Sequence, residues 1–136
     1  MRVVLDTNVL VVGLLSPSGP PGWIVEAMLS GDLEPAFDAA IRGEYEDVLR
    51  RRELSLEPAR VKVLLDALEQ FGLEITAAPW PKDLPDPDDV PFLAVSGALA
   101  CPLVTGNLRH FPMKARAGVT VLSPREFLTI FSRERH

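Results

Sequence analysis

Short apolar runs alternate along the chain with longer segments in which apolar residues recur at helical spacing. The first run, residues 3–5, is short and β-branched, as buried strands are. We expect strands at residues 3–5, 33–37, 73–76, 103–105 and 119–122. Each run is followed by a polar or turn-forming stretch, so the pattern predicts several short strands separated by helices.

The longer segments predict helices. Ile41, Tyr45 and Leu49 recur on one helical face, and Ser123 with Glu126 forms a capping box before the last apolar segment. The expected helices are residues 7–15, 23–30, 39–52, 57–71, 89–100 and a last one that begins after Ser123, with loops at 16–22 and 78–91.

Strands that alternate with helices are typical of an α/β fold with a parallel sheet. A length of 136 residues suits a single domain over residues 1–136. Ligands of such sheets bind outside the carboxyl ends of the strands. The polar residues after Leu5, Phe37 and Val104 are therefore the candidates for chemistry.

Composition narrows the function. Proteins that grip nucleic acid through its phosphates are usually basic, so the net charge of −5 argues against a broad, non-catalytic nucleic-acid binder. A nuclease remains compatible with this charge, because carboxylates that hold divalent ions are counted as negative. No apolar run is long enough to span a membrane. Cys101 is the only cysteine, which fits a reducing, cytoplasmic location.

Asp6 and Glu44 are the first candidate site residues. Asp6 directly follows the first strand, where it can either cap the next helix or belong to a site at the sheet edge. Glu44 lies on or beside the apolar stripe of its helix. It is either a rim residue whose head reaches water or a carboxylate that is paired or metal-bound, because a bare buried charge is costly.

Two further polar corners follow. Asp86, Asp88 and Asp89 place three carboxylates ahead of one helix, which indicates either a cap with a turn or a bound cation. Like charges this close raise one another's pKa unless a cation neutralises them. Thr105 and Asn107 stand at another strand-to-helix corner, which is either a plain turn with an Asn cap or part of the site.

A parallel sheet can bring these corners to one edge. Carboxylates with few nitrogen ligands suit Mg²⁺ or Mn²⁺, and such ions activate water against a phosphodiester. One Cys and two His cannot supply a zinc site. The sequence also lacks the glycine pattern of nucleotide-binding loops and the elbow of serine hydrolases.

Basic and aromatic residues that could contact RNA are few. Residues 50–52 are three arginines at a helix end, which either bind RNA or are simply solvated. Arg109 and His110 follow the Asn107 corner and are the better candidates for phosphate contacts. Trp23 and Trp80 can stack on bases, although Trp23 also suits a core or a dimer interface.

The chain resembles the PIN-domain family, and within it the VapC-like toxins of toxin–antitoxin pairs. The resemblance rests on four motifs in order: Asp6-Thr7-Asn8, Glu44, the segment 86–94, and Thr105-Gly106-Asn107 followed by His110-Phe111-Pro112. It implies a Rossmann-like α/β/α sandwich, Mg²⁺ or Mn²⁺ held by acidic residues, and endonucleolytic cleavage of RNA. It also implies a homodimer and a small antitoxin partner.

Site roles can be carried over residue by residue. Asp6, Glu44 and Asp89 match the first three acidic positions of the family, with Asp86 the less secure candidate for the third. These three would ligate the metal. Asn107 occupies the place where many members have a fourth Asp, which puts tight binding of a second metal in doubt. Asn8 and Thr105 would support the site.

The expected function is thus a metal-dependent endoribonuclease that acts as a toxin. One alternative is a phosphotransfer enzyme with Asp6 as nucleophile, but haloacid-dehalogenase-like enzymes want Asp where this chain has Asn8. The other is a degenerate, non-catalytic PIN domain that binds RNA or protein, which Asn107 and the negative charge would favour.

Overall fold

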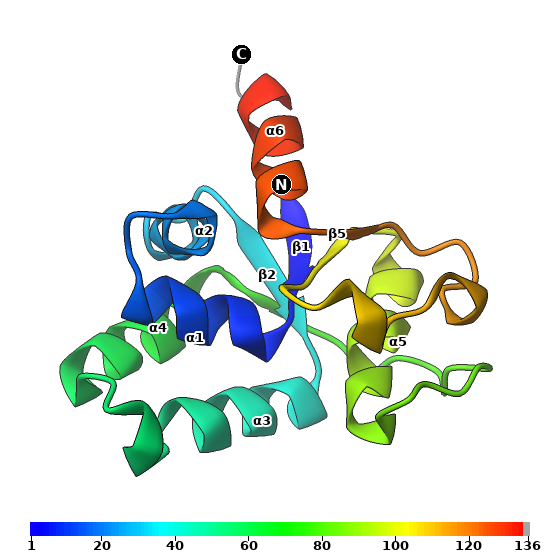
Figure 1. Cartoon of the computed structure of the whole chain (residues 1–136), viewed down its shortest axis with the longest axis horizontal. Coiled ribbons are helices and arrows are strands. Elements are labelled where there is room, and N and C mark those ends of the chain that lie inside the picture. The colour runs from blue at the N-terminus through cyan, green and yellow to red at the C-terminus, as the bar shows by residue number, and fades with distance from the viewer. Residues whose placement is uncertain (135–136) are drawn as a thin grey trace.

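Five parallel strands form a central sheet in the computed structural model, which describes residues 1–134 (Figure 1). The strand order is β3-β2-β1-β4-β5, and every neighbouring pair is parallel. The strands are β1 (Arg2–Leu5), β2 (Glu34–Phe37), β3 (Leu73–Glu74), β4 (Leu103–Val104) and β5 (Val121–Leu122). The α/β fold with a parallel sheet is confirmed.

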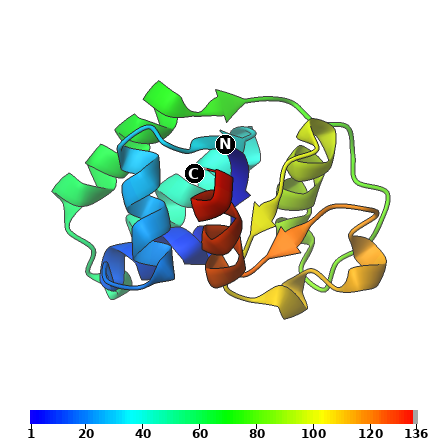
Figure 2. The same cartoon turned by 90° about the horizontal axis from the view of Figure 1, so that it is seen from above.

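Helices cover both faces of this sheet. They are α1 (Thr7–Leu15), α2 (Pro20–Leu29), α3 (Ala39–Leu49), α4 (Pro58–Phe71), α5 (Val90–Leu99) and α6 (Pro124–Glu134). Figure 2 shows α5 on one side of β1 and β4, with α1, α2 and α6 on the other. The molecule is therefore an α/β/α sandwich. No helix within residues 1–134 has the length and apolar character of a membrane span.

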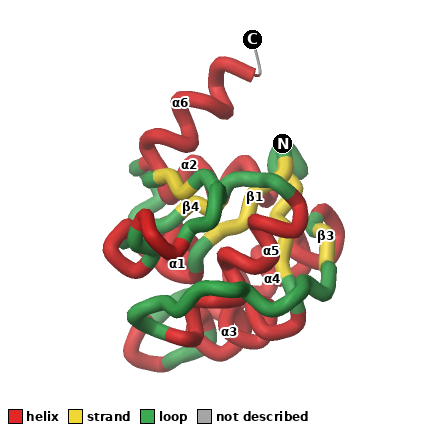
Figure 3. Tube along the Cα trace, turned by 90° about the vertical axis from the view of Figure 1, so that its right-hand side faces the viewer, coloured by secondary structure: helices red, strands yellow, loops and turns green. Residues whose placement is uncertain are grey.

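The central strand β1 forms the middle of the core. Val3, Val4 and Leu5 are all buried, which explains why this strand is a continuous apolar run and not an alternating one. Its register places Val4 opposite Leu103 of β4. On the far edge, a long loop leaves β3 and leads to α5 (Figure 3). This loop carries the aspartates at positions 86–89 back to the carboxyl edge of the sheet.

Several boundaries differ from those expected. Helix α2 begins at Pro20 and not at residue 23, because proline fits the first helical turn, where no N–H bond is needed. Helix α3 ends at Leu49 and not at residue 52, and a short 3₁₀ turn, Arg52–Leu54, follows it. Ser55 then adopts the left-handed conformation that redirects the chain. Strands β3 and β5 are shorter than expected.

The capping box of α6 forms as expected. The Ser123 N–H donates to Glu126 Oε1 over 2.9 Å, and the Glu126 N–H donates to Ser123 Oγ over 3.1 Å. These bonds lower the pKa of the Glu126 carboxyl. The helix start was thus encoded locally, independent of tertiary packing.

Gly22 is expected to be the most sensitive glycine of the α1–α2 pair. A Cβ added there would overlap the backbone carbonyl of Pro17, which cannot move as a flexible side chain can. Gly22→Ala should therefore destabilise the fold by roughly 2–3 kcal/mol in chemical denaturation. Gly43 of α3 is the matched control, since nothing lies within 4 Å of its added Cβ. Gly43→Ala should stabilise by roughly 0.5–1 kcal/mol, and equal effects at both positions would contradict this packing.

Candidate active site at the carboxyl edge of the sheet

Asp6 and Thr105 lie at the point in the sheet where the strand order reverses. The chain runs from β1 to β2 and β3 on one side, whereas β4 and β5 lie on the other side of β1. Such a switch point opens a crevice at the carboxyl ends of the two central strands. Asp6 follows β1 and Thr105 follows β4. The Thr105 hydroxyl donates to Asp6 Oδ2 over 2.7 Å, which joins the two strand ends.

The Asp6 carboxylate is not a helix cap. Its residue is the N-cap of α1, but its side chain makes no capping hydrogen bond. The side chain is only 5% exposed, and burial raises the pKa of the carboxyl above its usual value. The Thr105 hydroxyl, the nearby backbone N–H of Thr7 and the charge of His110 act against this rise in pKa. A buried carboxylate outside a capping role is a candidate ligand or acid–base group.

Glu44 reaches the same place from α3. It is half-buried, and the Thr7 hydroxyl donates to its Oε2. Burial raises the pKa of Glu44, the Thr7 bond lowers it, and the charges of Asp6 and Asp88 raise it further. Of the two interpretations of the sequence, the structure therefore favours a paired carboxylate over a plain rim residue.

Tyr45, next to Glu44, fixes α3 against the end of β1. Its ring is buried, and its hydroxyl donates to the Leu5 carbonyl. Burial raises the pKa of the phenol well above its usual range, so the hydroxyl stays a donor. This bond fastens α3 to the end of β1, next to Glu44 on the helix and Asp6 on the strand.

Asp89 arrives from the opposite side. It ends a 3₁₀ turn, Pro87–Asp89, immediately before α5, and it is 7% exposed. Its Oδ2 is buried and accepts no hydrogen bond, although His110 Nδ1 lies 3.3 Å away without the geometry of a bond. Burial, followed by the charge of Asp6, raises the pKa of Asp89 to about 6.

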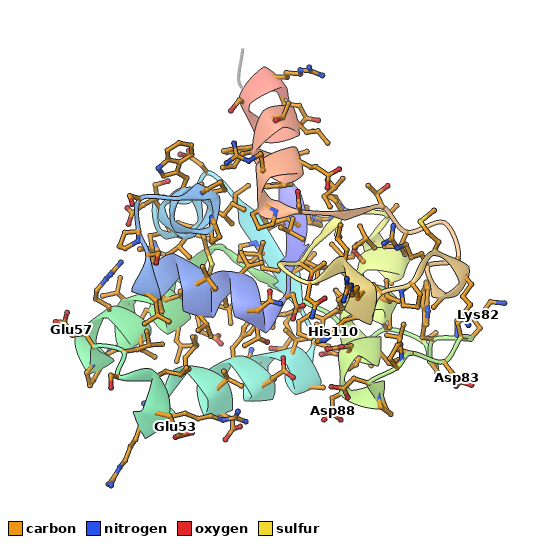
Figure 4. All side chains as sticks on the ribbon, viewed as in Figure 1. Glu53, Glu57, Lys82, Asp83, Asp88 and His110 are labelled. Atoms are coloured by element: carbon orange, nitrogen blue, oxygen red, sulfur yellow. The ribbon has the colours of Figure 1, made fainter. Side chains whose placement is uncertain are left out.

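Asp86 and Asp88 lie outside this group. Both are exposed, and Asp86 Oδ1 accepts the Asp88 N–H over 2.9 Å, as in a capped turn. Figure 4 shows Asp88 at the periphery, whereas His110 lies beside the start of α1. The cap-and-turn interpretation therefore fits Asp86, and Asp89 is the carboxylate that the turn directs inward.

The corner after β4 is tied to α1. Asn8 Oδ1 accepts the Gly106 N–H over 3.1 Å, and the Asn107 N–H donates to Thr105 Oγ1 over 3.0 Å. Asn107 makes no side-chain cap. It thus supports the site through its backbone, which orients the Thr105 hydroxyl toward Asp6.

A hollow of about 380 Å³ joins these groups. Asp6, Glu44, Asp89 and His110 line it, together with apolar side chains of α1 and α3 and the guanidinium of Arg51. Asn107 and Arg109 do not line it. Glu53 also lines it, so the hollow has four carboxylates beside the side chains of Arg51 and His110.

The donor set fits a hard divalent cation. As the side chains stand, no three His, Cys, Asp or Glu within residues 1–134 are grouped closely enough to hold a metal ion. The buried Asp89 Oδ2 nevertheless lacks a hydrogen-bond partner, and the charge of Asp6 raises the pKa of both Glu44 and Asp89. A cation would satisfy that oxygen and relieve the repulsion. Asp6, Glu44 and Asp89 are the residues that could hold it.

Some residues of the site were not expected from the sequence. Thr7 and Tyr45 were not singled out, because a hydroxyl bond across the fold leaves no local pattern. Arg51 lines the hollow and donates to Asp47 over 2.8 Å, whereas Arg109, the favoured cation, is exposed and has no carboxylate partner among residues 1–134. Arg51 belongs to the arginine run 50–52, which the sequence already offered as a possible RNA contact.

The two tryptophans lie away from the acidic group. The Trp80 indole N–H donates to the Ala115 carbonyl over 2.9 Å, and its ring packs against Gly97, so it is a structural residue. Trp23 is 58% exposed and lines a groove between α2 and α6, so it is not a core residue.

Comparison with known proteins points to one family. Residues 2–109 match the family model described as PIN domain. The crystal structure of FitAcB from Neisseria gonorrhoeae is similar, with a TM-score of 0.54 and 20% identity over 90% of this chain and 98% of that one. The structure of FitAB bound to an IR36 DNA fragment gives 0.53 and 19% over 90% and 94%. No curated protein matches the chain.

Proposed function

This chain belongs to the PIN-domain family, and from that membership we propose that it is a metal-dependent endoribonuclease, the toxin of a toxin–antitoxin pair. The observation that carries the proposal is the meeting of Asp6, Glu44 and Asp89, from three separate elements, at one hollow where a buried carboxylate oxygen has no hydrogen-bond partner. The VapC-like motif order supports the toxin role. The likeness to the two FitAB structures supports the fold on which this proposal rests.

Each residue of the site has a role in the proposed reaction. Asp6, Glu44 and Asp89 would hold Mg²⁺ or Mn²⁺, which when bound would acidify a water and offset charge on the phosphate. Thr105 and Thr7 fix two of these carboxylates by hydroxyl donation. Water loses a proton and adds to phosphorus, the bond to the leaving oxygen breaks, and that oxygen takes up a proton, so the products are one phosphate end and one hydroxyl end.

The remaining polar groups would place the substrate. His110 and Arg51 line the hollow and can meet the phosphate oxygens, and Arg109 extends the basic rim outside it. Asn8 and Asn107 hold the corner that carries Thr105. In place of a fourth carboxylate, Asn107 leaves the site one negative charge weaker, which favours a single firmly held ion.

Other properties are part of the same proposal. We propose a single domain over residues 1–136, a homodimer, a cytoplasmic location and a small antitoxin partner. The match over residues 2–109 supports a domain that occupies most of the chain. The alternative function is a degenerate PIN domain that binds RNA or protein without cleaving it. The loose grouping of the carboxylates within residues 1–134 favours that alternative.

Cleavage of single-stranded RNA tests the proposal directly. The purified chain should cut an end-labelled RNA when Mn²⁺ or Mg²⁺ is present, and chelation by EDTA should stop the reaction. Calorimetry in the same buffer should show heat of Mn²⁺ binding. Binding of RNA without any cut, at millimolar Mn²⁺ and with no heat of metal binding, would establish the degenerate domain instead.

A further inference from the structure

The arginines of residues 50–52 surround a second hollow, between the end of α3 and the start of α4. It measures about 330 Å³ and is lined by the three arginines, Ser55 and an apolar floor that includes Leu49 and Val61. Arg50 and Arg52 are exposed, and neither pairs with a carboxylate anywhere in residues 1–134.

Arg51 connects this hollow to the acidic one. Its side chain lines both the arginine hollow and the hollow that contains Asp6, Glu44 and Asp89. It pairs with Asp47 over 2.8 Å, at the surface between the two hollows. A chain that occupies the acidic hollow and leaves it past Arg51 therefore reaches Arg50 and Arg52 next.

We propose that the arginine hollow is a subsite for single-stranded RNA, which binds a nucleotide that adjoins the cleaved bond. The inference rests on the proposed function, because it assigns a path to the substrate of that reaction. Arg50 and Arg52 contact phosphate oxygens, and the floor at Leu49, Leu56 and Val61 receives a ribose or base. Guanidinium groups suit phosphates because their planar donors can bind two oxygens at once.

Two glutamates flank this part of the chain. Glu53 directly follows Arg52, Glu57 comes just before α4, and Figure 4 shows the two well apart from each other. Arg50 and Arg52 are exposed and have no carboxylate partner among residues 1–134. An acidic protein segment would meet the same arginines, but it would gain nothing from continuity with a hollow that four carboxylates line.

A charge-removal variant tests the subsite. Arg50→Gln/Arg52→Gln is compared with Arg125→Gln/Arg133→Gln, which removes two exposed arginines from α6 and changes the net charge equally. Binding is measured by fluorescence anisotropy in an Asp6→Asn background, with a single-stranded RNA about 12 nucleotides long. The first pair should weaken binding roughly tenfold and reduce the slope of log affinity against log salt by about 0.7 per lost contact, so by about 1.4. The α6 pair should change neither value.

Kinetics in the cleavage-competent protein give a second readout. Arg50→Gln/Arg52→Gln should raise KM and leave kcat unchanged, since the arginines bind RNA but do not touch the cleaved bond. If the parent binds and cleaves RNA while both pairs behave alike, the subsite is wrong and the proposed function stands. If the parent neither binds nor cleaves, both are wrong.

An acidic peptide identifies the other possible occupant. A fluorescent polyglutamate of the same charge as the RNA is titrated against the same variants. Loss of affinity for polyglutamate with none for RNA would overturn the subsite, because it would show that the arginines dock an acidic protein segment. A loss of affinity for RNA that clearly exceeds the loss of affinity for polyglutamate would support the RNA subsite.

Discussion

Replacing Asp6 with Asn is expected to reduce Mn²⁺-dependent RNA cleavage by about a thousandfold or more, a loss of roughly 4 kcal/mol in transition-state stabilisation. Asp6 interacts electrostatically with both other carboxylates, because its charge raises the pKa of Glu44 and of Asp89. An amide keeps the shape and still accepts the Thr105 hydroxyl, but it lacks the charge that draws a cation. The assay is cleavage of labelled RNA at saturating Mn²⁺.

The same variant should fold as the parent does. Burial raises the pKa of the Asp6 carboxyl, which shows that the charge is held at a cost in the metal-free protein. The thermal midpoint of Asp6→Asn without metal should therefore equal or exceed that of the parent. Asp66→Asn, at an exposed position paired with Lys62, is the matched control and should cleave normally. Undiminished cleavage by Asp6→Asn would mean that the reaction occurs elsewhere.

Asp89→Asn and Asp86→Asn should separate the two candidates for the third carboxylate. Asp89 is buried and lines the acidic hollow, whereas Asp86 is exposed and caps its own turn. Asp89→Asn should lower kcat about a hundredfold or more and weaken Mn²⁺ binding in calorimetry, because it removes a ligand charge. Asp86→Asn should change kcat by less than about threefold. The reverse order of effects would assign the third position to Asp86.

The pH dependence of stability gives Asp89 an independent readout. Its folded pKa of about 6 lies above the ordinary value of 3.8, so the folded protein binds a proton that the unfolded chain has released. Stability from this group is complete below about pH 4 and is lost as pH rises to about 6. Metal-free Asp89→Asn should therefore be more stable than the parent at neutral pH, and the difference should vanish near pH 4. A constant difference across this range would rule out a perturbed Asp89.

The fold was largely predictable from patterns that act locally. The capping box at Ser123, the apolar stripe of α4 and the β-branched run of β1 each depend on a few neighbouring residues. Boundaries were less predictable where tertiary contacts decide them. Prolines at the start of α2 extended it, and Ser55 in a left-handed conformation separated α3 from α4.

The sequence predicted the carboxylates of the site, but it did not predict the hydroxyl groups that position them. Asp6 and Glu44 were identified because a charge next to an apolar run is conspicuous in a sequence, whereas Asp89 was chosen among three neighbouring aspartates through the resemblance to the PIN-domain family. Thr7 and Tyr45 were not, because a hydroxyl that bonds across the fold has the same local context as one that faces solvent. The structure brings these carboxylates to one hollow, and their roles stay predictions until the variants are measured.

The bond between Thr105 and Asp6 spans 99 residues of sequence, which has a consequence for how such an enzyme is synthesised. A growing polypeptide on the ribosome presents Asp6 first, then Glu44, and much later Asp89 and the strand that carries Thr105. Until β4 takes its place beside β1, Asp6 has neither its hydroxyl partner nor the crevice around it. Under the proposed function, the site would therefore be incomplete, and unable to cut the messenger that encodes it, until β4 and Thr105 have left the ribosome.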